Sequence, residues 1–240
     1  MILRVMSYNI GHYNMGLSEG GFPPELLTEK LTGLKEMLME TGPDLIGIQE
    51  DTHYVDRAGT KKSPATVYSP VWSFRNGYKY ETIRAKYRIV SGSYALVDFS
   101  NGQHYRKGTF TIGGKPVLVV STHMIAHTGN SDKRKVQYTE LFKAISSAEA
   151  CIVTGDFNTT EKADKATLTA LCEKNGFTMA IGSYLPWVDT YLGRTAGATR
   201  HSFDNILVSK WITIRTTKVL RDWYGRLYSD HVPVIADIEI

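Results

Sequence analysis

The sequence has 240 residues, of which 42% are hydrophobic and 22% are charged, as is usual for a globular protein with a large buried core. These values exclude a fibrous or a largely disordered chain. The net charge of +4 suits a phosphate-bearing substrate but is too small to indicate one by itself.

Short apolar runs rich in β-branched residues, separated by turn residues, predict strands along the whole chain. In chain order these runs are residues 3–6, 45–48, 95–99, 117–120, 151–153, 206–208, 212–214 and 232–238. Gly113 and Gly114 separate the apolar residues 109–112 from 117–120. This pair of glycines predicts a tight turn between two antiparallel strands.

Three stretches with apolar residues at three- and four-residue spacing predict helices at 24–40, 132–148 and 162–175. Strands mixed with helices, including a hairpin, favour an α+β fold with two stacked mixed β-sheets flanked by helices. The expected architecture is a four-layer α/β/β/α sandwich. Since we find no internal repeat and no linker, we expect residues 1–240 to form a single domain.

Cys151 and Cys172 form neither a CxxC pair nor a spaced framework, which argues against a disulfide scaffold and against a zinc site. The N-terminus lacks a basic region followed by a long apolar run, and no later stretch reaches the roughly 20 apolar residues of a membrane span. We therefore expect no membrane span and a cytoplasmic location, unless a leader segment has been removed.

Polar residues lie where the apolar runs begin or end. Four predicted strands are followed by such residues, and two later strands are preceded by them. If the two later strands run opposite to the first four, all these side chains meet at one rim of the sheets. The residues concerned are Asn9, Glu50, His123, Asp156, Asn158, Asp204, Asp230 and His231.

Carboxylates gathered at one rim repel each other unless a cation lies among them. Because the set offers oxygen ligands and no cysteine, Mg²⁺ or Mn²⁺ fits it better than zinc. Histidines and an amide beside such a metal supply what phosphoester hydrolysis requires, namely charge neutralisation, activation of water and stabilisation of the leaving oxygen. Each residue alone is more often a solvated strand end or a turn residue. Their convergence is what indicates a catalytic site.

Six segments, in this order, resemble the signature of the endonuclease/exonuclease/phosphatase superfamily, also called deoxyribonuclease-I-like. They are SYNI at 7–10, DLIGIQE at 44–50, STH at 121–123, GDFN at 155–158, FDNI at 203–206 and SDHVP at 229–233. Each segment alone is a weak signal, but six in the right order at strand ends are specific. The resemblance implies a Mg²⁺-dependent phosphoesterase, with Mn²⁺ as the alternative ion.

The same resemblance implies how the metal and the water are held. Glu50 would be the main metal ligand, helped by Asn9 and Asp230 directly or through water. Asp156 and Asn158 would position or deprotonate the attacking water and hold the phosphate.

The two histidines would act on the phosphate. His231 would contact the scissile phosphate, with Asp204 fixing its tautomer, and His123 would be a second phosphate contact or a proton donor. Either Asp156 or His231 is a candidate for the general base.

Four further residues are candidates for substrate binding. By the resemblance, Glu81 would pair with His123. Arg106 or its neighbour Lys107, at the start of the strand that leads to the hairpin, would reach a substrate phosphate. Trp223 and Tyr224, shortly before Asp230, would stack on bases or sugars, although packing in the fold explains them equally well. That set is Glu81, Arg106, Trp223 and Tyr224.

The substrate is the least constrained part of the prediction. We favour a monomeric phosphodiesterase or nuclease acting on nucleic acid, on the basis of the basic excess and the loop aromatics. A phosphomonoesterase, or a hydrolase of lipid headgroups or inositol phosphates, would use the same rim. Val153 and Thr154 stand where the inositol-polyphosphate branch carries a Trp, which disfavours that branch. A non-catalytic nucleic-acid-binding module is a third possibility.

Overall fold

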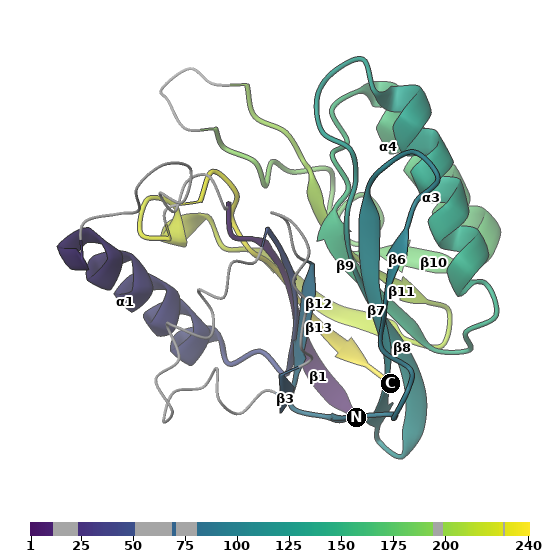
Figure 1. Ribbon diagram of the computed structural model, residues 1–240, viewed down its shortest axis with the longest axis horizontal. Helices are drawn as coiled ribbons and strands as arrows, with labels where there is room; N and C mark the ends of the chain where they lie inside the picture. The colour runs from purple at the N-terminus through teal and green to yellow at the C-terminus, as the bar shows by residue number, and fades with distance from the viewer. Residues whose placement is uncertain (12–23, 51–68, 71–80, 194–198, 228) are drawn as a thin grey trace.

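The computed structural model describes residues 1–11, 24–50, 69–70, 81–193, 199–227 and 229–240. Two β-sheets pack face to face. Helix α1 (Pro24–Thr41) covers one sheet, and helices α3 (Ser131–Ile145) and α4 (Lys162–Asn175) cover the other (Figure 1). This arrangement confirms the predicted four-layer α/β/β/α sandwich. Within the described residues, no helix is long and apolar enough to cross a bilayer.

Each sheet combines parallel and antiparallel strands. The order of the first sheet is β12 (Thr213–Val219), β13 (Val234–Glu239), β1 (Ile2–Asn9), β2 (Leu45–Gln49), β4 (Thr82–Ala85) and β3 (Ser69–Pro70). The order of the second is β10 (Phe177–Met179), β11 (Asp204–Ser209), β9 (Cys151–Asp156), β8 (Lys115–His123), β7 (His104–Ile112) and β5 (Arg88–Ile89). Strand β6 (Ala95–Asp98) also pairs with β7.

Most predicted elements lie where the sequence indicated, with changes at their ends. The hairpin is confirmed, because Ile112 pairs with Lys115 around two glycines in left-handed conformations. The strand predicted at 212–214 begins at Thr213 and continues to Val219, since Ile212 closes a turn by donating its N–H to the Ser209 carbonyl. The second predicted helix ends at Ile145 rather than at residue 148.

Strand direction decides whether the polar strand ends can meet. β1 and β2 are parallel in the first sheet, as are β8 and β9 in the second. The hydrogen bond from Asn9 at the end of β1 to Asp156 at the end of β9 places these carboxyl ends at one rim. β11 is antiparallel to β9, and β13 is antiparallel to β1, so the amino ends of these two strands lie at the same rim. The condition derived from the sequence is therefore met.

Successive side chains point to opposite faces of each strand, so the apolar residues form one core between the sheets and two cores between a sheet and its helices. On β1, Leu3 and Val5 face the other sheet, whereas Met6 and Tyr8 pack beneath α1. On the second sheet, a third cluster including Val120 packs beneath α3 and α4. Full burial of one such side chain stabilises the fold by about 1.5–3 kcal/mol, so these layers hold the rim rigidly.

The two sheets approach each other closely at Gly47 of β2. A Cβ atom at this position would lie 1.6 Å from Oγ1 of Thr154 and 2.6 Å from its Cβ. Thr154 is itself held, because its Oγ1 donates a hydrogen bond to the Val120 carbonyl at 3.0 Å. Only glycine allows this spacing between the sheets directly below the rim.

We predict that Gly47→Ala destabilises the protein by about 1–3 kcal/mol, because the added methyl group forces Thr154 or a whole strand to move. Urea unfolding followed by circular dichroism measures the change. Gly108→Ala is the matched control: its Cβ would approach side-chain atoms of Ile89, Tyr94 and Phe110 no closer than 3.1, 3.3 and 3.4 Å, so its loss should be smaller. Equal stabilities for wild type and Gly47→Ala would refute the steric argument.

Candidate active site

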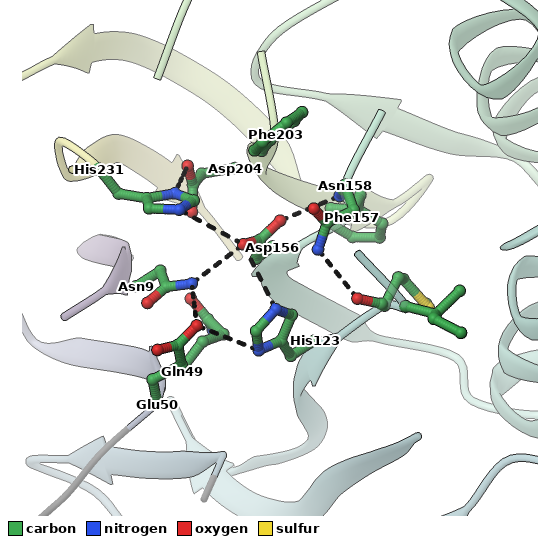
Figure 2. Close-up of polar contacts among 12 residues, drawn as sticks. Asn9, Gln49, Glu50, His123, Asp156, Phe157, Asn158, Phe203, Asp204 and His231 are labelled. Atoms are coloured by element: carbon green, nitrogen blue, oxygen red, sulfur yellow. Dashed lines mark hydrogen bonds and ion pairs between the residues drawn. The ribbon is translucent and has the colours of Figure 1, made fainter. Parts of the chain in front are cut away.

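The strand ends of both sheets converge on Asp156, as Figure 2 shows. Asn9 and Glu50 come from the ends of β1 and β2 in the first sheet, whereas His123 and Asp156 end β8 and β9 in the second. The remaining four residues of the predicted site lie in chain segments next to these strand ends. They are Asn158 after β9, Asp204 at the start of β11, and Asp230 and His231 shortly before β13.

Asn9 links the acids of the two sheets. Its Nδ2 donates to Oδ2 of Asp156 at 3.0 Å and to Oε1 of Glu50 at 3.3 Å. Its Oδ1 accepts the N–H of Gly11 at 2.9 Å, which fixes the orientation of the amide. Asn9 was expected to help bind a metal, and its contacts in the structure are those of a bridge between two carboxylates.

Asp156 is the centre of the cluster and is only 2% exposed. Its Oδ1 accepts the backbone N–H of Asn158 at 2.9 Å. Its Oδ2 lies 3.6 Å from Nε2 of His123 and 3.7 Å from Nε2 of His231. Burial raises the pKa of the Asp156 carboxyl, and the two imidazoles only partly oppose that rise. Such a carboxylate is a better proton acceptor than one in water.

His231 is held by Asp204, whose Oδ2 lies 2.8 Å from Nδ1 of the ring. This contact directs Nε2 of the ring toward Asp156. Burial by itself would lower the pKa of His231. The charge and hydrogen bond of Asp204, together with Asp156 and Asp230, outweigh burial and raise this pKa to about 10. The imidazole is therefore protonated at neutral pH unless a cation offsets the carboxylates.

Two residues of the site have left-handed backbones. Glu50 has a φ of 55° and Asn158 has a φ of 49°. Asparagine tolerates this region, whereas for glutamate it is uncommon. Nδ2 of Asn158 donates to the Met124 carbonyl at 2.9 Å, so the turn after β9 is tied to the turn after β8. Strained backbones of this kind cluster at functional sites.

The donor set fits a hard divalent cation. Asp156, Asp204 and His231 offer ligand atoms within 4.8 Å of one another. Nδ1 of His231 and Oδ2 of Asp204 already contact each other. Glu50 is more accessible to a cation than these residues, because 14% of its side chain is exposed. Two buried polar atoms, Oδ1 of Asp204 and Nδ1 of His123, have no hydrogen-bond partner among the described residues. The carboxylate oxygens, with no thiolate beside them, suit Mg²⁺ or Mn²⁺.

The predicted pair between Glu81 and His123 is wrong. Glu81 is buried, and its Oε2 lies 2.6 Å from Nε2 of His104, the first residue of β7. His123 instead faces Asp156 and, at 4.0 Å, Oε1 of Glu50. Glu81 therefore joins the two sheets beside the site, in a carboxylate–imidazole pair that depends on the position of β7.

The prediction that Arg106 reaches a substrate phosphate is also wrong, because its side chain is buried between the sheets. Its Nε donates to the Glu81 carbonyl at 3.2 Å, and its guanidinium lies 5.1 Å from the centre of the Tyr94 ring. These contacts assign Arg106 to packing beside the rim rather than to a substrate phosphate.

Trp223 and Tyr224 have different surroundings although they are adjacent. Trp223, in the short 3₁₀ helix η3 (Arg221–Trp223), belongs to the core beneath α1, and Arg226 covers its ring at 4.1 Å, so it is not available for stacking. Tyr224 is 41% exposed, and its hydroxyl donates to the Gly193 carbonyl. Stacking of Tyr224 on a base or sugar stays a prediction. The same prediction for Trp223 is wrong.

Sequence reasoning did not identify the aromatic and polar residues that support His231. Tyr191 packs edge-on against His231 at 5.1 Å and stacks on Phe203 at 5.0 Å, and His201 stacks on Phe203 at 4.9 Å. Thr190 is fully buried beside them. Residues 189–191 follow no strand or helix periodicity, so the sequence offered no local signal for them.

Arg134 supports the turns on the second-sheet side of the site. This fully buried guanidinium donates to the carbonyls of Ile125 and His127, and also to Oγ1 of Thr160 and Oδ2 of Asp164. The first two acceptors follow His123, and the last two follow Asn158. The Arg134 guanidinium therefore holds together both turns that carry site residues.

We predict that Asp164→Asn destabilises the fold by about 1.5–3 kcal/mol, the scale of a hydrogen bond to a charged group, because it leaves the buried Arg134 guanidinium with only the more distant Glu161 carboxylate, 3.6 Å from Nη2, as counterion. Burial opposes ionisation of Asp164, but hydrogen bonds from Arg134, from the Ser131 hydroxyl and from the Glu161 N–H outweigh it and lower the pKa. The pair thus stabilises the fold above the unfolded-state pKa of about 3.9, and this is lost as pH falls through the lower folded-state pKa.

Urea unfolding of wild type and Asp164→Asn between pH 3 and pH 7 measures this difference. The gap in unfolding free energy should be full at neutral pH and should narrow toward pH 3. Glu173→Gln, an exposed acid on the same helix, is the control and should change stability by less than about 0.5 kcal/mol. A gap that did not change with pH would contradict the assignment to the ion pair.

Comparisons with known proteins address the family and the fold. The model of the Endonuclease/Exonuclease/phosphatase family matches residues 6–231. No curated protein matches the sequence. The fold is similar to D. rerio TDP2 complexed with single-strand DNA product, with a TM-score of 0.77 and 19% identity over 100% of this chain and 99% of that one.

Two other solved structures have the same fold. The human Nocturnin catalytic domain with bound sulfate gives a TM-score of 0.66 at 22% identity, covering 99% of this chain and 94% of that chain. A mannosyl-6-phosphatase from Bacteroides thetaiotaomicron gives 0.69 at 17% identity, covering 99% and 100%. At these identities the likeness shows the fold alone.

Proposed function

Because the chain belongs to the Endonuclease/Exonuclease/phosphatase family, we propose that it hydrolyses a phosphodiester of nucleic acid, with a divalent cation and water as the attacking group. The family comprises phosphoester hydrolases, and this chain is an enzyme of that reaction class. One observation carries the finer proposal. A buried carboxylate, Asp156, lies within 3.7 Å of two imidazoles and is bridged by Asn9 to a more accessible acid, Glu50.

We assign the cation to Glu50, with Asn9 and Asp230 assisting and with Mg²⁺ or Mn²⁺ as the ion. When bound, the cation neutralises charge on the phosphate and lowers the pKa of water. Nδ2 of Asn9 holds Glu50 and Asp156 close together, and these two acids would otherwise repel each other. A cation that offsets this repulsion accounts for their proximity.

Asp156 is the general base in this proposal. Its raised pKa brings it closer to neutral pH, where a base that accepts a proton from water is most effective. Asn158 holds it in place, because its backbone N–H donates to Oδ1 of Asp156 and leaves Oδ2 facing the imidazoles.

His231 and His123 stabilise the phosphate in this proposal. With Nδ1 engaged by Asp204, a protonated His231 presents its Nε2–H to a phosphate oxygen and to the charge that develops during attack. His123 lies on the other side of Asp156, where its Nε2 has a similar distance to the same carboxylate. The two imidazoles thus flank the position at which water would be activated.

Nucleic acid is favoured as the substrate by the aromatic rings beside His231. Tyr191 adjoins the imidazole and His201 adjoins Tyr191, and both are only partly buried, so they offer a surface on which a base can stack. D. rerio TDP2, which shares the fold, was solved with a single-strand DNA product. The second candidate is a sugar phosphomonoester, because a mannosyl-6-phosphatase shares the fold as well.

A substrate panel tests this choice directly. Single-strand DNA, duplex DNA, RNA, a chromogenic phosphodiester, a sugar 6-phosphate and an inositol phosphate are each assayed with Mg²⁺. Turnover that is highest on a nucleic acid supports the proposal. Turnover confined to the sugar phosphate would replace it with the phosphomonoesterase.

Metal removal is expected to abolish turnover. Dialysis against EDTA should reduce the rate to background, and Mg²⁺ or Mn²⁺ should restore it, since the clustered acids would lose the cation that offsets their repulsion. Isothermal titration of Mg²⁺ into wild type and Glu50→Gln tests the assignment of the cation to Glu50 without an activity assay. Full activity in EDTA would remove the metal from the mechanism.

Asp156→Asn should lower kcat by about a hundredfold or more, the usual scale for loss of an acid–base or charge-stabilising group. His231→Ala should lose a comparable amount. Steady-state kinetics normalised to folded protein measure both changes, and Asp132→Asn, an exposed acid of α3, is the matched control. If Asp156→Asn turned over at the wild-type rate, Asp156 could not be the base.

A further inference from the structure

We propose that Thr190 is a positioning residue for the Asp204–His231 pair. It acts within a short clip, residues 190–192, that ties the two sheets together at the rim. The inference rests on the proposed function, because it assumes that this pair acts in the reaction. It adds a residue that is absent from the six motif segments of the sequence.

The Asp204–His231 pair needs such support because its members belong to different sheets. Asp204 begins β11 in the second sheet, whereas His231 leads into β13 of the first. β11 and β13 are not hydrogen-bonded neighbours in either sheet. The 2.8 Å contact between Nδ1 of His231 and Oδ2 of Asp204 therefore depends on whatever fixes the spacing of the sheets at this point.

The clip lies between the two arms that carry the pair and makes backbone hydrogen bonds to both. On the Asp204 side, the N–H of Thr190 donates to the His201 carbonyl at 2.9 Å. On the His231 side, the N–H of Val232 donates to the Thr190 carbonyl at 2.8 Å, and the N–H of Leu192 donates to the Asp230 carbonyl at 2.8 Å. The clip thus continues the hydrogen-bonded network from one sheet to the other.

The Thr190 side chain adds a contact to Asp204 itself. Its Oγ1 accepts the backbone N–H of Phe203 at 3.0 Å and that of Asp204 at 2.9 Å, and the residue is fully buried. Thr190 thus bonds to the backbone of Asp204 through its hydroxyl and to the residue that follows His231 through its carbonyl. A single residue therefore spans both arms of the pair.

The next residue of the clip contacts the imidazole directly. The Tyr191 ring packs edge-on against His231, with the ring centres 5.1 Å apart, and stacks on Phe203 at 5.0 Å. A shift of Thr190 would therefore move both the carboxylate that holds the imidazole and the ring that packs on it. Displacements of about 1 Å in a catalytic group lower rates by about a hundredfold.

Thr190→Val tests the role of the hydroxyl, because valine keeps the shape and removes the acceptor. We expect kcat to fall about 10- to 100-fold with KM within about twofold of wild type, since substrate contacts remain. Thr190→Ser keeps the acceptor and should recover most of the turnover. Thr178→Val, an exposed threonine of β10, is the matched control.

Valine leaves the N–H groups of Phe203 and Asp204 without this acceptor, which also destabilises the fold, so folding must be measured beside activity. Rates are normalised to the folded fraction from circular dichroism, below the midpoint of thermal unfolding. Thr190→Ala, which leaves room for a water molecule, serves as a second variant. If either folded variant has wild-type kcat, the proposal is overturned.

A double-mutant cycle separates positioning from general stabilisation. If Thr190 acts through the pair, Thr190→Val should cost no further activity in an Asp204→Asn background. Multiplicative losses would overturn the proposal, because they would show an effect independent of the pair. Failure of the proposed function looks different: Asp204→Asn would then be as active as wild type, whatever Thr190→Val does.

Discussion

The hydrogen bonds that Asn9 makes to Glu50 and Asp156 join the carboxyl ends of three strands from two sheets. Glu50 and Asp156 then lie beside the imidazoles of His123 and His231 in a largely buried cluster. Burial raises the pKa of the Asp156 carboxyl. Such a cluster is stable only if each charge is paired or hydrogen-bonded. Asn9 and the Asn158 N–H hydrogen-bond to Asp156, and Asp204 pairs with His231, whereas Oδ1 of Asp204 and Nδ1 of His123 have no hydrogen-bond partner among the described residues. In the proposed function, a bound cation and the substrate phosphate would supply the remaining charges.

The position of the cluster depends on supports that touch no substrate. Gly47 allows the sheets to approach below the rim, Arg134 holds the turns that follow β8 and β9, and Thr190 links the arms that carry Asp204 and His231. Each support acts on a different pair of elements. Together they fix the spacing of the sheets and the two loops, and so the distances between groups that lie far apart in the sequence.

Charge distribution distinguishes the two ends of the site. Around His231, Asp204 and Asp156 favour the protonated ring, whereas at the other end Glu50 is more exposed than Asp156. A cation at Glu50 and a protonated imidazole at His231 would contact different oxygens of one phosphate. In the proposed function, Asp156 lies between them and accepts the proton of the water. In the same proposal, the neighbouring rings of Tyr191 and His201 offer a stacking surface beyond the phosphate.

The sequence alone determined the elements and most members of the site, because apolar periodicity and polar strand ends are local properties. Asn9, Glu50, His123, Asp156 and His231 all follow from the polar residues at strand ends. Tertiary structure decided the partners. Glu81 pairs with His104 rather than His123, Trp223 is buried beneath α1, and Thr190 lies between two arms. These outcomes depend on which strands become neighbours and how closely the sheets approach, and such long-range packing leaves no mark in local sequence spacing.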